Sequence, residues 1–172
     1  YVNILISFCY FSILAASLNL LIGYSGQISL GHAAFMSIGA YTYAILTKTY
    51  DVHFLLAIVA ALVIAFLSGI ILGMASSKLG AIYLAIATVG FANTINLIII
   101  NEGWLTGGAN GFVGIKRLTI FGYELSNFEL YYVALFVTMI VFLITYRIIN
   151  SKTGRAIQAI SNAPIAASSM GI

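Results

Sequence analysis

The chain has 172 residues, of which 62% are hydrophobic and only 6% are charged, and its formal net charge is +3. Soluble domains carry about 25% charged residues, so this composition cannot cover a soluble surface and predicts an integral membrane protein. No basic cluster interleaved with aromatic residues is present, which argues against nucleic-acid binding. The single cysteine, Cys9, lies in an apolar stretch and indicates neither a disulfide framework nor a metal site.

A membrane-crossing helix needs about 20 mostly apolar residues. Five stretches of the sequence meet this requirement: 1–22, 27–47, 54–75, 79–100 and 130–149. We therefore expect an all-α membrane protein, a polytopic helical bundle of about five spans in a single domain over 1–172. The chain starts at Tyr1 without a signal-peptide pattern, and we expect it to be an internal piece of a longer polypeptide.

The first two spans flank a break in helical propensity, "LNLLIGYSGQISLGHAAF" at 18–35. Gly23 and Gly26 weaken the helix, Ser25 suits an N-cap, and Gln27 is expected to begin the second helix. Two interpretations are open. The stretch is either a tight turn at the membrane surface or a break buried in the bundle, where a helix N-terminus could face an anionic group such as a carboxylate.

Small and polar residues recur at helical spacing on several spans, for example Ala85, Thr88, Ala92 and Asn96 on the fourth. Such stripes usually mark faces where membrane helices pack closely. The alternative is that their polar members line a route for solute, because polar amides in lipid need partners. Together with the break, the candidate pathway residues are Asn19, Tyr24, Ser25, Gln27, Ser29, His32, Thr88, Asn93 and Asn96.

His32 has two interpretations of its own. A histidine inside the membrane could relay protons or bind a ligand, but no span contains an Asp or Glu to partner it. A neutral, hydrogen-bonded histidine that supports the break is favoured. One histidine without nearby cysteines or carboxylates makes no metal site.

The long connection 101–129 is polar and glycine-rich, and its "TGGANG" at 106–111 suits a gate, a contact for a partner protein or simply a flexible turn. If the tail 150–172 is cytoplasmic, four basic residues lie inside: Lys78, Arg147, Lys152 and Arg155. Lys48, Lys116, Arg117 and all four acidic residues then lie outside. This weak positive-inside bias places 101–129 outside the cell.

The tail reads as two short helices, one over about 154–161 and a second that Asn162 caps, with Pro164 in its first turn and Gly171 at its stop. A helix that lies on a lipid surface usually carries many basic and aromatic residues. This tail has one arginine and no aromatic residue in that stretch, so docking to a cytosolic partner is favoured.

Three long blocks carry a resemblance to a known family: "LNLLIGYSGQISLGHAAFMSIGAY", "YLAIATVGFANTINLIIINEGWLTGGANGFVGI" and "GRAIQAISNAPIAASSMGI". They resemble the branched-chain amino-acid ABC transporter permeases of the LivM type, in order and over nearly the whole chain. The resemblance implies a subunit of a bacterial or archaeal importer in the cell (inner) membrane, with further spans after Ile172.

The resemblance also implies partners. These are a second, LivH-type permease subunit, two cytosolic ATPase subunits and an extracytoplasmic substrate-binding protein, with ATP and Mg²⁺ bound by the ATPases and no cofactor on this chain. It implies that the tail is the ATPase-coupling segment, with candidate residues Gly154, Arg155, Ala166, Ala167 and Gly171. Family members often carry acidic residues near Asn162, Pro164 and Ser168, and this sequence has none there.

The substrate class implied is leucine, isoleucine and valine, although similar permeases are associated with urea or short amides. The chain has no phosphate-binding G-x-x-x-x-G-K-[ST] loop, so it performs no ATP chemistry itself. Two other classes are disfavoured. An ion-coupled secondary transporter predicts intramembrane carboxylates, and an intramembrane enzyme needs partners for His32 that the sequence does not supply.

Overall fold

The computed structural model describes residues 1–76, 81–112, 114, 119–120 and 123–163. Its backbone is dominated by helices, and four of the described helical segments are long and apolar enough to cross a membrane: Val2–Tyr24, Phe54–Ser76, Tyr83–Asn101 and Asn127–Ile149. The chain is therefore an all-α, polytopic integral membrane protein, as its composition predicted. It divides into two compact units, Tyr1–Ser29 with Leu125–Ile172, and Leu30–Glu124.

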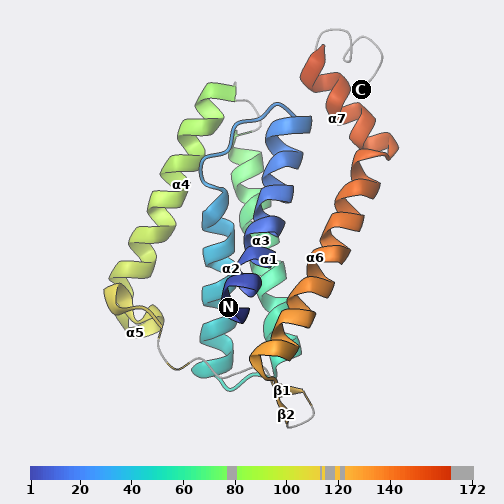
Figure 1. Ribbon diagram of the computed structural model, residues 1–172. Coiled ribbons are helices and arrows are strands. Elements are labelled where there is room, and N and C mark those ends of the chain that lie inside the picture. Colours follow the sequence, from blue (N-terminus) through green and yellow to red (C-terminus); the bar gives the residue numbers. More distant parts are fainter. Residues whose placement is uncertain (77–80, 113, 115–118, 121–122, 164–172) are drawn as a thin grey trace. The chain divides into compact units, whose positions relative to one another are not determined.

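The first unit contains α1 (Val2–Asn19), the π-helical turn η1 (Leu20–Tyr24), α6 (Asn127–Ile149) and α7 (Lys152–Asn162), and α1 packs along α6 (Figure 1). The start of α6 is fixed by a capping box, in which Ser126 Oγ accepts the Glu129 amide and Glu129 Oε2 accepts the Ser126 amide at 2.7 Å. Both orphan amides at this helix start are thereby satisfied.

The second unit contains α2 (His32–Lys48), α3 (Phe54–Ser76), α4 (Ala81–Asn101), the short α5 (Gly103–Thr106), the 3-10 turn η2 (Gly108–Asn110) and a two-residue antiparallel hairpin. The hairpin pairs β1 (Thr119–Ile120) with β2 (Tyr123–Glu124) inside the predicted loop. Helix α2 packs against both α3 and α4 (Figure 1).

The second predicted span differs from expectation. Helix α2 has 17 residues and begins at His32, with Gly31 as its N-cap residue, and not at Gln27. Ser25 is not an N-cap, because its hydroxyl donates to the Leu21 carbonyl at 2.5 Å. Gly26, with φ +67°, turns the chain out of the π-helical segment, and residues 26–31 remain non-helical. At 1.5 Å per residue α2 is about 25 Å long, shorter than the bilayer core of about 30 Å.

Candidate functional site

The start of α2 is held against the middle of α4 by two contacts with one residue. The Leu30 amide donates to Thr88 Oγ1 at 3.1 Å, and the Thr88 hydroxyl in turn donates to the Ala85 carbonyl at 2.8 Å. The Gly31 backbone lies so close to the Thr88 carbonyl that a Cβ on Gly31 would overlap its oxygen. Thr88 is only 3% exposed. Its hydroxyl therefore supplies, in an apolar environment, the acceptor that the non-helical Leu30 amide would otherwise lack.

Two contacts of the Phe35 ring show that this start is recessed within its unit. The Phe35 and Phe91 rings lie 5.2 Å apart, and Phe35 also lies within van der Waals distance of the space beside Gly69 on α3. Gly69 precedes the end of α3 by seven residues and Thr88 follows the start of α4 by seven, which is about 10 Å in each case. Both neighbouring helices therefore extend past the first turn of α2. Within this unit the start of α2 is thus recessed and does not lie level with the ends of these two helices.

A recessed helix start has a definite chemistry. The first amides of a helix have no intrahelical acceptor, and the aligned peptide dipoles give this end a partial positive charge. Such an end can hold a carboxylate. His32 is the first residue of α2, is half-buried, and packs its ring edge-on to Phe35 at 6.3 Å between centroids.

The other predicted pathway residues fall in both units. In the second unit Asn93 and Asn96 lie further along α4 and are exposed, whereas Thr88 is buried. In the first unit the Asn19 side chain lies against the Gly23 backbone, Gln27 is exposed and Ser29 is buried. The predicted set is thus divided between the two units: Asn19, Tyr24, Ser25, Gln27 and Ser29 in the first, and His32, Thr88, Asn93 and Asn96 in the second.

The predicted tail helix is present as α7, slightly longer than expected. Ser151 Oγ caps it by accepting the Gly154 amide at 3.2 Å, and Arg155 Nη1 donates to the Asn150 carbonyl at 3.0 Å. Gly154 is buried where a Cβ would overlap the carbonyl oxygens of Ile148 and Ile149. The sharp turn from α6 into α7 therefore requires glycine at 154.

Helix α7 lies against the π-helical turn that follows α1. It contacts η1, and a Cβ on Gly26 would overlap Ser161 Oγ, on the last turn of α7. The segment that precedes the break thus touches the tail helix within the first unit. Several predicted residues lie outside the described residues: Lys78, Lys116, Arg117, Pro164, Ala166, Ala167 and Gly171, together with the second tail helix.

The glycine-rich "TGGANG" segment is a hydrogen-bonded turn whose centre is Thr106, a residue that sequence reasoning did not single out. Thr106 is 4% exposed. Its hydroxyl lies 2.5 Å from the Ile99 carbonyl and 2.8 Å from the Glu102 carbonyl, and it accepts the Gly108 amide at 3.2 Å. A threonine before two glycines signals a turn, but nothing in the sequence shows that it folds back onto the preceding helix.

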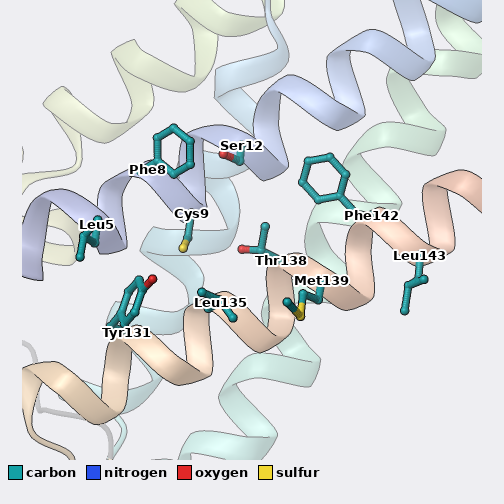
Figure 2. A pocket seen from close by; sticks show the side chains of 10 residues that line it. All are labelled: Leu5, Phe8, Cys9, Ser12, Tyr131, Leu135, Thr138, Met139, Phe142 and Leu143. Carbon is teal, nitrogen blue, oxygen red and sulfur yellow. The ribbon is translucent and has the colours of Figure 1, made fainter.

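An apolar cavity of about 550 Å³ lies between α1 and α6 in the first unit (Figure 2). Its only polar groups are the Tyr131 phenol, the hydroxyls of Ser12 and Thr138, and the Cys9 thiol; the remaining lining is Leu5, Phe8, Leu135, Met139, Phe142 and Leu143. No lining residue is charged, so this cavity is unsuited to the ammonium and carboxylate of a free amino acid. Within the described part of the chain, no three His, Cys, Asp or Glu side chains come together to hold a metal ion.

Comparison with known proteins gives one consistent result. The family model described as the permease component of the branched-chain amino-acid transport system matches residues 1–172. The high-affinity branched-chain amino-acid transport system permease protein LivM is 33% identical over 184 residues in Escherichia coli K12 and 32% identical in Salmonella typhimurium LT2. Each match covers 93% of this chain and 43% of the relative, so the chain spans less than half the length of these proteins. No solved structure matches the chain.

Proposed function

Because the chain belongs to the branched-chain amino-acid transport permease family, we propose that it forms part of the membrane pathway of an ABC importer for leucine, isoleucine and valine. It works in the cell membrane of a bacterium or archaeon, beside a second, LivH-type permease subunit. Two cytosolic ATPases drive the cycle with ATP and Mg²⁺, and an extracytoplasmic binding protein delivers the substrate. The chain itself lines part of the pathway, moves during the cycle and performs no hydrolysis.

The recessed start of α2 is the observation that carries this proposal. A free amino acid has a carboxylate that must leave water on its way across the membrane, and the N-terminal end of a helix offsets part of that cost. Gly31 and Thr88 hold this end against α4. His32 stands beside it on the first turn of α2 and contributes a polar side chain to the route.

The contact between α7 and η1 supports the coupling role. In this proposal 150–172 is the cytoplasmic segment that docks on an ATPase, with Gly154 and Arg155 setting its angle to α6. Ala166, Ala167 and Gly171 belong to the same segment. A displacement of α7 moves Ser161 and, through their contact, Gly26. Gly26 is the first residue of the non-helical segment that leads to α2. The connection 101–129 is placed on the opposite, extracytoplasmic side.

The test is uptake by proteoliposomes that contain the full-length permease with its partner subunits and binding protein. We expect ATP-dependent accumulation of radiolabelled leucine, with competition by isoleucine and valine and none by urea or acetamide. Competition by the amides alone would move the substrate to the urea class. Uptake driven by a proton or sodium gradient without nucleotide would replace the ABC mechanism with ion coupling.

A further inference from the structure

The end of the second unit at which α2 and α4 both finish differs from the rest of its surface. Lys48, the last residue of α2, places its Nζ 4.6 Å from the centre of the Phe112 ring, and α5 also contacts α2. The turn after α4 therefore lies beside the last turn of α2. Charged Lys48, Asp51 and Glu102 gather here, and Tyr50 and Trp104 are 63% and 81% exposed.

The Trp104 side chain has a defined position relative to the end of α4. Its Nε1 donates to Glu102 Oε2 at 2.7 Å, while most of the ring remains exposed. Thr106 ties α5 back to the Ile99 carbonyl, which belongs to the last turn of α4. The span Tyr83–Asn101 has 19 residues, about 28 Å at 1.5 Å per residue, which nearly matches the bilayer core of about 30 Å. Trp104 therefore stands close to the level where the hydrocarbon ends.

The last turns of α4 before Trp104 expose mainly aliphatic side chains, with the exposed amides of Asn96 and Asn101 among them. Leu97, Ile98 and Ile100, on the last turns of α4, are 58%, 50% and 44% exposed. Aliphatic side chains followed by an indole whose N–H is bonded to a carboxylate are the groups expected where a helix leaves a bilayer. Tryptophan prefers that boundary because its ring is apolar and its N–H is polar.

We propose that Trp104, with Tyr50, is a lipid anchor: the indole inserts among the upper acyl chains at the headgroup level and fixes the height of α4 and of the turn after it. The occupant of this surface is phospholipid. The Glu102 carboxylate orients the ring by holding its N–H on the water side. This inference depends only on the chain spanning a membrane, so it is independent of the transported substrate.

Trp104 is the only tryptophan among the 172 residues, so it can be observed by fluorescence. The full-length protein and its W104F variant are placed in phosphatidylcholine vesicles, and the difference between their emission spectra isolates Trp104. We expect emission to the blue of free tryptophan in water. We also expect strong quenching by lipids brominated near the headgroup, weaker quenching by lipids brominated near the chain end, and little quenching by aqueous acrylamide.

The E102A variant is the matched control for orientation: it retains the ring and removes the acceptor of the ring N–H, and we expect its emission to shift to the red with stronger acrylamide quenching. Strong acrylamide quenching of the unmodified protein without bromine quenching would place Trp104 in water, on a surface for a protein partner, and would overturn the proposal. Stronger quenching from deep than from shallow bromines would overturn it as well, because the ring would then lie below the headgroups.

Discussion

The Leu30 amide donates a 3.1 Å hydrogen bond to the hydroxyl of Thr88, 58 residues later in the chain. This bond joins the last non-helical residues before α2 to the interior of α4. It also accounts for the late start of α2, since an amide engaged by a side chain and a glycine pressed against a carbonyl leave no room for a helix begun at Gln27. The break therefore depends on a tertiary contact within the second unit.

Substitution of Gly31 by alanine tests the close approach. The new Cβ would overlap the Thr88 carbonyl, a backbone atom that cannot rotate away, so we expect a loss of about 1–3 kcal/mol of stability and loss of uptake. Gly39 lies in the same helix with nothing within 4 Å of its Cβ position. Thermal unfolding in detergent should show normal stability for G39A, and equal melting of the two variants would refute the role of Gly31.

The Thr88 hydroxyl can be removed with little change of shape. In T88V the Leu30 amide loses its acceptor. We expect this change to cost about 1 kcal/mol of stability and to lower the rate of leucine uptake. T88S keeps a hydroxyl and should retain most of the stability and of the uptake rate. Thr94 on the same helix donates to the Gly90 carbonyl, one turn earlier in that helix, and is exposed, so T94V is the matched control. The hypothesis fails if T88V and T94V transport alike.

These two residues also show what the sequence could and could not predict. Thr88 was identified because its spacing places it on a stripe of small and polar residues. Such a stripe belongs to one helix and can be recognised from the sequence of that helix alone. The partner of that stripe is the Leu30–Gly31 backbone, which carries no side-chain signal. The start of α2 was therefore predicted five residues early, at Gln27, and the buried hub Thr106 was missed for the same reason.

Four of the five predicted spans and the first tail helix were predictable because their signals are local. Runs of about 20 apolar residues fix the long helices almost regardless of their neighbours, and α7 begins where a serine can cap it. The predicted pathway residues, in contrast, were chosen because they are polar, and polarity does not show which side chains lie close together. Asn93 and Asn96 are polar and lie on α4 but are exposed, whereas Thr88 is buried, a difference that spacing along a single helix did not resolve.

The contact of Gly26 with α7 predicts a partial rescue. In G26A the residue must hold φ +67°, which costs about 1–2 kcal/mol for a residue with a Cβ, and its Cβ meets Ser161 Oγ. The double variant G26A/S161A relieves the overlap and leaves the backbone strain. We expect it to melt between the G26A variant and the unmodified protein, and the S161A variant alone to be nearly neutral. A G26A/S161A variant no more stable than G26A would mean that Ser161 does not contact this segment.

Gly154 sets the angle between α6 and α7. Alanine there would overlap two carbonyl oxygens of α6, so α7 must move, and we expect G154A to lose ATPase association in a pull-down with the purified partner subunits. The control is G73A, at a glycine of α3 with open space around it. Normal ATPase binding by G154A would show that the turn into α7 is not needed for docking.

The most direct measurement asks whether the start of α2 lines the route of the substrate. His32 is replaced by cysteine in a full-length protein whose other cysteines, including Cys9, are serine, and labelling by a small water-soluble thiol reagent is followed in proteoliposomes. We predict labelling at position 32 that slows when leucine, binding protein and ATP are supplied, while a cysteine at Leu62, on the exposed face of α3, stays unlabelled. Absence of labelling at 32, or a rate that leucine does not change, would contradict a pathway at this helix start.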